Sequence, residues 1–194
     1  MNNQSLMIAI VIDTNDPDNL GRVLITLPAL PDGPELWARL VTTLAGSDRG
    51  LCLIPEIGDE VLVAFTQGEL SSAYVLGGIW GKQKQPPEGL GGEKNDLKLF
   101  KTRSGHTLTF DDKDGEEKIE LKDKNGNTFE IATSEDTITL TAKSKIVIKT
   151  DGDIELSGKK FTLKASEIEL KADSSLALDG GGTAELKAGT VNIN

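Results

Sequence analysis

The sequence predicts an all-β protein in which a small closed barrel is followed by a β-helical rod. Three observations point to this fold class. Residues 5–80 divide into short apolar strands separated by turn-forming residues, that segment shows no helical period, and from residue 119 onward an apolar-x-apolar pair recurs at short intervals. A short strand with two inward side chains, followed by a polar corner, is the repeating unit of a β-helix.

The first eighty residues predict the barrel. Candidate strands are residues 7–12, 22–27, 37–43, 51–54, 60–65 and 74–79, and the segments between them are rich in Gly, Pro, Asn and Asp. Closing five or six short strands into a barrel removes the exposed sheet edges. We therefore predict an OB-like barrel over residues 1–80.

The composition sets limits on the compartment and on disulfides. Cys52 is the single cysteine and lies in the apolar run Gly50-Leu-Cys-Leu-Ile54, so an intrachain disulfide is excluded and a buried core thiol is expected. The first residues lack the basic region of a signal peptide, and no apolar stretch approaches the roughly 18 residues of a membrane span. We expect synthesis in the cytoplasm without a signal peptide.

The charge balance argues against nucleic-acid binding. The formal charge of −10 divides into −6 for residues 1–95 (6 basic, 12 acidic) and −4 for residues 96–194 (15 basic, 19 acidic). Nucleic-acid sites need clustered Lys and Arg to neutralise phosphates. Trp37 and Trp80 are accordingly expected in the barrel or at an interface rather than in a base-stacking site.

Several polar residues invite a catalytic or metal-binding interpretation, and each is better explained otherwise. Glu56, Asp59 and Glu60 have no basic partner nearby in the sequence, so they read as turn residues. The acidic run of residues 111–117 fails the EF-hand pattern, because a glycine at the sixth position would put Phe110 at the first ligand position. His106 is the only histidine, so a site would need three copies around an axis; we predict no cofactor, metal or catalytic residue.

A connection and a collar precede the regular repeat. Residues 81–96 are rich in Pro and Gly and predict a linker, and residues 97–133 predict hairpins of a neck or collar. The pairs Leu97/Leu99 and Leu108/Phe110 share the apolar-x-apolar signature at 11-residue spacing. The dipeptides Asp114-Gly115 and Asn125-Gly126 favour tight hairpin turns with positive φ.

The repeat itself predicts the core of the rod, which we assign to residues 134–194. First members of successive pairs lie 10, 9, 8, 8, 7, 7, 8, 8 and 7 residues apart. The predicted core pairs are Ile119/Leu121, Phe129/Ile131, Ile138/Leu140, Ile146/Ile148, Ile154/Leu156, Phe161/Leu163, Ile168/Leu170, Leu176/Leu178, Ala184/Leu186 and Val191/Ile193, with Ala184 replacing a larger residue near the tip.

Two architectures accommodate this repeat. One chain could coil on itself into about three coils, since a single-chain β-helix uses roughly 18–25 residues per coil. Alternatively, three chains intertwine and ten units stack into a prism of about 50 Å at about 4.8 Å per strand. We favour the trimer, because three coils of one chain would make a stubby body with exposed ends.

The barrel segment also resembles a known family. The residues that carry the resemblance are Gly21-Arg-Val23, Trp37-Ala-Arg-Leu40, Ala45-Gly46, Pro55-Glu-Ile-Gly-Asp-Glu-Val-Leu-Val-Ala-Phe65, Gly68-Glu69, Tyr74-Val-Leu-Gly77, Trp80 and Pro86-Pro87. In order and spacing they resemble the OB domain of phage baseplate assembly protein V and of the VgrG spikes of type VI secretion, over residues 8–90. Leu70-Ser-Ser72 departs from the pattern, where a more polar or proline-bearing loop is expected.

The resemblance implies a structural homotrimer: the central spike of a contractile injection device in a phage tail baseplate or a secretion particle. Its OB domain would seat on the tail-tube hub, and its rod would puncture the target envelope. Some relatives close their tip around a metal with a His-x-His pair, but nothing after His106 is histidine. We therefore expect a separate PAAR-repeat tip protein to dock on Val191, Asn192, Ile193 and Asn194. The alternatives are a β-helical glycan-degrading enzyme, or an OB-fold binding module with a trimerising stalk.

Overall fold

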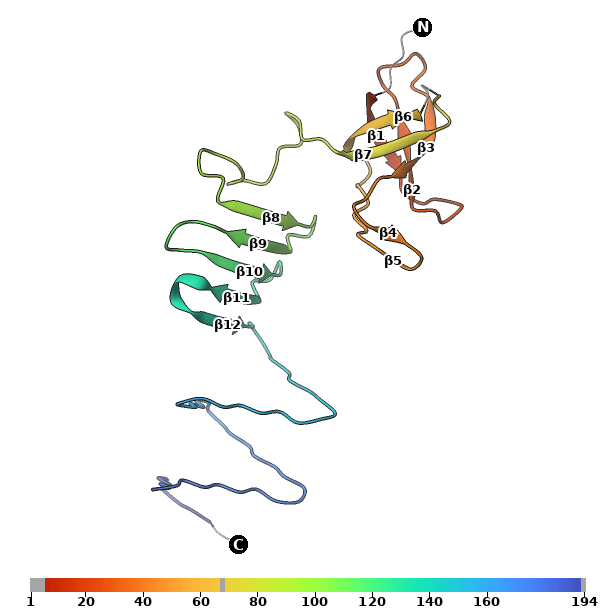
Figure 1. Cartoon of the computed structure of the whole chain (residues 1–194). Helices are drawn as coiled ribbons and strands as arrows, with labels where there is room; N and C mark the ends of the chain where they lie inside the picture. The colour runs from red at the N-terminus through yellow and green to blue at the C-terminus, as the bar shows by residue number, and fades with distance from the viewer. Residues whose placement is uncertain (1–5, 67–68, 193–194) are drawn as a thin grey trace. The chain divides into compact units, whose positions relative to one another are not determined.

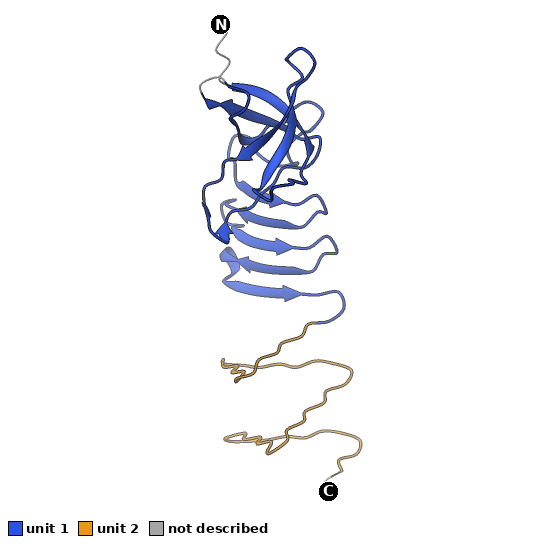
Figure 2. Ribbon diagram, turned by 90° about the vertical axis from the view of Figure 1, so that its right-hand side faces the viewer, with its two compact units in different colours: residues 1–145 blue, residues 146–194 orange. Residues whose placement is uncertain are grey.

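The computed structural model describes residues 6–66 and 69–192 of the chain. The contacts within the chain divide it into two units, Met1–Lys145 and Ile146–Asn194, which Figure 2 shows in separate colours. No helix among the described residues is long and apolar enough to cross a membrane.

Five strands of the first unit close into a barrel (Figure 1). They are β1 (Leu6–Asp13), β2 (Arg22–Thr26), β3 (Glu35–Leu40), β6 (Glu60–Phe65) and β7 (Ala73–Gly78). Their order is β1-β2-β3-β7-β6, with β6 returning to pair with β1; only β3 and β7 run parallel. This closed five-stranded arrangement fits an OB domain and confirms the barrel that the sequence predicts.

The barrel core is built from alternating strand residues. In β6, for example, Val61, Val63 and Phe65 point inward while the intervening residues face outward. The buried apolar residues of the described chain all belong to the barrel and form one cluster: Met7, Ala9, Val11, Val23, Ile25, Leu27, Ala38, Val61, Val63, Phe65, Ala73 and Val75. Ile25 and Leu27 are fully buried, so the barrel has a closed interior of its own.

A hairpin departs from the barrel between β3 and β6. Two predictions made for this segment are wrong. It contains the short strands β4 (Ala45–Gly46) and β5 (Arg49–Gly50), and residues 51–54, predicted as a strand, are an extended segment without one. Cys52, predicted to be a buried thiol, is exposed. The reason is that residues 41–54 leave the barrel and Pro55 ends the segment, so this apolar run adds no strand to the core. We call residues 41–54 the arm.

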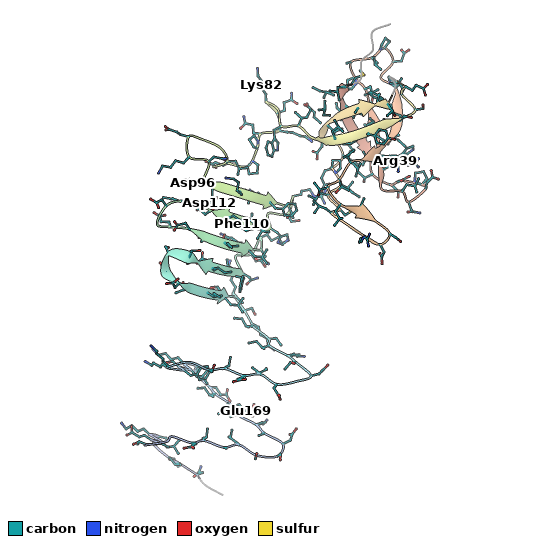
Figure 3. The ribbon with its side chains drawn as sticks, viewed as in Figure 1. Arg39, Lys82, Asp96, Phe110, Asp112 and Glu169 are labelled. Carbon is teal, nitrogen blue, oxygen red and sulfur yellow. The ribbon has the colours of Figure 1, made fainter. Side chains whose placement is uncertain are left out.

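A second sheet follows the linker. Its five strands are β8 (Leu97–Lys101), β9 (Thr107–Asp111), β10 (Lys118–Lys122), β11 (Thr128–Ala132) and β12 (Thr137–Thr141). Each strand pairs antiparallel with the next along the chain, and a short 3₁₀ turn, η2 (Thr133–Glu135), connects the last two. At the left end of the sheet in Figure 3, the backbone N–H of Asp112 donates to the carbonyl of Asp96 at 3.0 Å.

The second unit has no assigned strand within residues 146–192, and each of those residues is exposed. Figure 1 draws it as a trace that reverses direction several times. Two bends of the chain are held by a short polar side chain two residues before a glycine. The N–H of Gly152 donates to Thr150 Oγ1 at 3.0 Å, and the N–H of Gly181 donates to Asp179 Oδ1 at 2.8 Å.

Candidate functional site

The turns of the five-stranded sheet fix its register. Gly105, Gly115 and Gly126 lie in three successive hairpin turns and have φ angles of +91°, +77° and +88°, a region that favours glycine. The turns after Asp114 and Asn125 therefore have the positive φ predicted for their Asp-Gly and Asn-Gly dipeptides. Because the side chains of a strand alternate between faces, a fixed register decides which residues share a face.

That register gathers apolar side chains on one face of the sheet. Residues directly opposite each other on paired strands lie on the same face. One row crosses all five strands as Phe100, Leu108, Leu121, Phe129 and Leu140, and a second row crosses them as Lys98, Phe110, Ile119, Ile131 and Ile138. Nine of the ten positions are apolar. We call these nine residues the apolar face.

The apolar face is open to solvent in the single chain. Ile138 is 69 % exposed and Leu121 is 56 % exposed, and only Leu108 and Ile131 are half-buried. Phe110, labelled in Figure 3, belongs to this face and is 43 % exposed. A contiguous apolar surface of this kind marks a place where a soluble protein meets a partner.

The opposite face of the sheet is polar. Its rows contain Thr, Lys and Glu, and Lys118 pairs with Glu130 on the neighbouring strand at 3.4 Å. Both of these side chains are partly exposed, so the pair contributes little to stability. The sheet is thus amphipathic, with one face suited to water and the other to burial.

The register separates Leu97 and Leu99 from the apolar face, although they share the apolar-x-apolar signature. Leu97 lies opposite Asp111 and Leu99 lies opposite Thr109, so both leucines belong to the polar face. Leu97 instead approaches the linker, where a Cβ added to Gly89 would lie 3.3 Å from its Cδ1. Phe100 takes the place on the apolar face, and sequence reasoning missed it because Leu99 and Phe100 are both apolar and hide the alternation.

Side chains of the turns connect alternate hairpins. His106 Nδ1 accepts the backbone N–H of Lys124 at 3.3 Å, and Asn127 Oδ1 accepts the backbone N–H of Lys143 at 2.9 Å. His106 and Asn127 occupy the same place in two related segments, Thr102-Arg-Ser-Gly-His106 and Asp123-Lys-Asn-Gly-Asn127. This 21-residue repeat is the signal that sequence reasoning overlooked.

Two of the three carboxylates considered for catalysis lie in ion pairs. Glu56 pairs with Arg103 at 2.9 Å, and Asp59 pairs with Lys84 at 2.8 Å. Burial by itself raises the pKa of Asp59, but hydrogen bonds from Lys84 and from the backbone of Glu56 outweigh it and lower that pKa. These basic partners come from distant parts of the chain, so the turn at residues 55–59 is an ion-paired structural element.

Asp16 organises the loop between β1 and β2. Its buried carboxylate accepts backbone N–H bonds from Asp18, Leu20 and Arg22 and a further bond from the Arg22 guanidinium at 2.7 Å. The Arg22 bond is the main cause that holds the pKa of Asp16 well below its usual range. The guanidinium of Arg22 also lies over the ring of Trp37, 5.6 Å from its centroid, which places Trp37 in the barrel wall.

The predicted core residues of the rod lie in two settings. Ile119, Leu121, Phe129, Ile131, Ile138 and Leu140 share the apolar face of the sheet. Ile146, Ile148, Ile154, Leu156, Phe161, Leu163, Ile168, Leu170, Leu176, Leu178, Leu186 and Val191 lie in the second unit and are exposed. Among the expected tip-docking residues, Val191 and Asn192 are exposed, while Ile193 and Asn194 lie outside the described residues.

No group of three or more His, Cys, Asp or Glu side chains in the described part of the chain is arranged to hold a metal ion. Phe100, Leu108 and Phe110 extend the predicted core toward the linker. The arrangement offers apolar surface for assembly.

Comparison with known proteins identifies the barrel. Residues 7–80 match the family of type VI secretion system/phage-baseplate injector OB domains. Over 113 residues the chain is 30 % identical to the type VI secretion system spike protein VgrG3 of Vibrio cholerae and 34 % identical to the actin cross-linking toxin VgrG1 of another strain of that species. The alignments cover 54 % of this chain but only 11 % and 10 % of those relatives.

These matches confirm the resemblance seen in the sequence. They also reach beyond the barrel, because 54 % of the 194 residues exceeds the 74 residues of segment 7–80. The chain spans about a tenth of the length of the curated relatives it matches.

Proposed function

We propose that this chain, whose residues 7–80 are an injector OB domain of the family shared by type VI secretion systems and phage baseplates, is the structural central spike of a contractile injection particle. The family supports a role in a baseplate spike and implies assembly into a trimer. The finer parts of the proposal are the three-chain rod, the seat on the tail tube, the piercing of the envelope and the separate tip.

The observation that carries the proposal is the apolar face of the five-stranded sheet. Each of its strands has five residues and directs two side chains to that face, which suits a narrow shared interior. Three copies with these faces turned inward enclose a dry core and leave the Thr, Lys and Glu rows in water. The exposed pairs of residues 146–191 continue the same pattern, with the three chains supplying one another's strand partners.

A three-chain rod suits mechanical work. Unfolding it requires three chains to separate, which slows the loss of structure under force or heat. Two of the three candidate carboxylates, Glu56 and Asp59, lie in ion pairs, and we propose that the chain is not an enzyme. Stiffness and kinetic stability are what a part driven through an envelope needs.

The two ends of the spike are proposed to bind different partners. The barrel seats on the tail-tube hub, and its outer surface offers Leu6 and Ile8 of β1 for such a contact, which are 54 % and 52 % exposed. A PAAR-repeat tip protein docks on the repeat around Val191 to Asn194, where Val191 and Asn192 are exposed in the single chain. By its family the protein works in a tail or injection particle.

The experiment compares two neighbouring substitutions that differ only in the face they occupy. Ile138→Asp places a carboxylate on the apolar face, and Thr139→Asp places one on the polar face of the same strand. In a single chain both positions are exposed, so both variants fold. In the trimer Ile138→Asp buries three unpaired charges, each at a cost of several kcal/mol.

Solution mass, measured by light scattering, decides the assembly. The parent chain and Thr139→Asp are expected at the mass of three chains, and Ile138→Asp at the mass of one. In rebuilt particles, Ile138→Asp is expected to abolish delivery across the target envelope while Thr139→Asp retains it. A parent chain that is a stable monomer, or an Ile138→Asp variant that remains trimeric, would refute the three-chain rod.

A further inference from the structure

The arm, residues 41–54, is an ordered hairpin rather than a loose loop. At its base the N–H of Val41 donates to the carbonyl of Val75 in β7 at 2.9 Å. Along its length Thr42 Oγ1 donates to the carbonyl of Leu51 at 2.8 Å, and the N–H of Leu51 donates to the carbonyl of Leu44 at 3.0 Å. Figure 1 shows β4 and β5 extending away from the strands of the barrel.

The hairpin is packed too tightly to carry a side chain at Gly50. A Cβ added there would lie 2.6 Å from the carbonyl oxygen of Leu44, closer than real Cβ contacts. The turn at residues 55–59, which ends the arm, is held by Arg103 on Glu56 and by Lys84 on Asp59. An arm fixed in this way loses little conformational entropy when it binds a partner.

The arm is also strongly apolar on its surface. Five large apolar side chains of the arm are between 44 % and 57 % exposed: Val41, Leu44, Leu51, Leu53 and Ile54. Cys52 lies among them and is exposed as well. So many apolar groups on a short projecting hairpin mark a contact surface.

A cavity of about 990 Å³ lies beside the arm and connects it with the sheet. One side is formed by arm residues 46 and 48–54, and another by Phe100 to Arg103 at the end of β8 together with Val75, Gly77 and Gly78 of β7. Phe100 is also the first residue of one row of the apolar face. The apolar surface of the arm therefore continues into the face that three copies bury in the proposed spike.

We propose that the arm packs on a neighbouring copy of this chain and forms the barrel-level part of the trimer interface. A cyclic trimer joins two different surfaces of each copy, and this chain offers both a protruding apolar hairpin and an apolar recess. Continuity with the apolar face favours a second copy over a different protein. The proposal rests on the three-chain spike proposed above and adds a specific contact to it.

Cys52 allows a direct test, because it is the only cysteine of the chain. The full-length protein is mixed with a thiol-reactive maleimide under native conditions, and the labelling rate is followed by mass spectrometry. Ile138→Asp, expected to be a single chain, gives the rate of a free arm. In the parent trimer Cys52 is expected to react at least tenfold more slowly.

A second variant separates the arm from other exposed leucines. Leu53→Ser removes an apolar side chain of the arm. Leu70→Ser is the control: it removes the side chain of Leu70, which lies in the loop between β6 and β7 and is 42 % exposed. Leu53→Ser is expected to restore fast labelling of Cys52 and to make the trimer dissociate at a higher protein concentration when it is diluted. Tryptophan fluorescence checks that the barrel of each variant is folded, and Leu70→Ser is expected to behave as the parent.

The outcomes distinguish the two proposals. A stable trimer in which Cys52 reacts as fast as in Ile138→Asp overturns the docked arm and leaves the spike standing. Slow labelling that appears only after the tail-tube protein is added overturns it too, because the partner is then a different protein. A parent chain of single-chain mass overturns both proposals.

Discussion

The barrel and the second unit use the same aliphatic side chains in opposite ways. In the barrel, Val23, Ile25 and Val61 are removed from water by strands of their own chain. In residues 146–192 the Ile and Leu side chains are exposed, and no strand partner from the same chain is assigned. The barrel therefore has a complete core within one chain, whereas the described residues of the second unit bury no apolar side chain in the single chain.

The five-stranded sheet lies between these extremes. Its strands satisfy one another's backbone hydrogen bonds, as the barrel strands do, but its apolar side chains remain exposed, as those of the second unit do. Along the chain, the single chain first ceases to bury its apolar side chains, in the sheet, and then also ceases to pair its strands, in the second unit. In the proposed trimer, neighbouring copies supply burial to the sheet, and both burial and pairing to the second unit.

The largest expected effect compares a buried with an exposed isoleucine. Ile25→Ala leaves a cavity in the barrel and is expected to destabilise it by about 2–5 kcal/mol. Ile168 is 53 % exposed in the single chain. Ile168→Ala is therefore expected to lower the free energy of unfolding by about 0.5 kcal/mol or less, unless other copies cover this side chain. Urea unfolding of each variant at one fixed protein concentration measures both effects.

The Ile168→Ala result then sharpens the comparison. In a three-chain rod the same substitution removes three side chains from one level of the core, so the trimer is expected to dissociate at lower urea. The control is Ile8→Ala on the outer surface of the barrel, which is expected to change stability by less than about 0.5 kcal/mol. An Ile168→Ala trimer as resistant to urea as the parent argues against a shared core at that level.

The sequence was sufficient for the barrel strands because their apolar residues alternate. Glu60–Phe65 was predicted with the bounds that the structure has, since Val61, Val63 and Phe65 alternate with outward residues. The arm was misjudged because residues 50–54 are apolar throughout. A continuous apolar run does not say whether a neighbouring strand covers it, and here none in the barrel does.

The candidate surface could be predicted only in part. Regular pairs such as Ile119/Leu121 and Phe129/Ile131 do share one face, but the pair Leu97/Leu99 does not indicate the face of its strand, because Leu99 and the adjacent Phe100 are both apolar. Contacts such as Arg103 with Glu56 join residues 47 positions apart. The spacing of residues in the sequence does not indicate contacts between residues so far apart in the chain.

An intermediate effect is expected for the loop that Asp16 organises. Asp16→Asn keeps the shape of the side chain but removes the charge that accepts bonds from Arg22 and three backbone N–H groups, so the barrel is expected to lose stability at neutral pH. Asp18→Asn is the control, because Asp18 is 64 % exposed and shares only the Arg22 contact. The urea midpoint at pH 7 is expected to fall clearly for Asp16→Asn and little for Asp18→Asn.

The pH dependence of that effect follows from the sign of the pKa shift. The folded barrel holds the pKa of Asp16 below its ordinary value of 3.8. The charged carboxylate therefore stabilises the fold above that ordinary value, and its contribution disappears as the pH falls through the lowered pKa. The difference between parent and Asp16→Asn is expected to be constant from pH 7 to about 5 and to shrink below 3.8. A difference that grows toward low pH would contradict this account.

The smallest expected effect concerns the turns of the five-stranded sheet. His106 accepts the backbone N–H of Lys124, and in the related turn Asn127 does the same for Lys143. His106→Ala is expected to cost about 1 kcal/mol or less, because the bond is near the surface, and to speed the exchange of the Lys124 amide hydrogen. His106→Asn supplies an acceptor of the kind that the chain itself uses at residue 127, so it is expected to restore much of the protection. If the alanine and asparagine variants exchange equally fast, the side chain of His106 does not support the turn, and the 21-residue repeat describes the backbone alone.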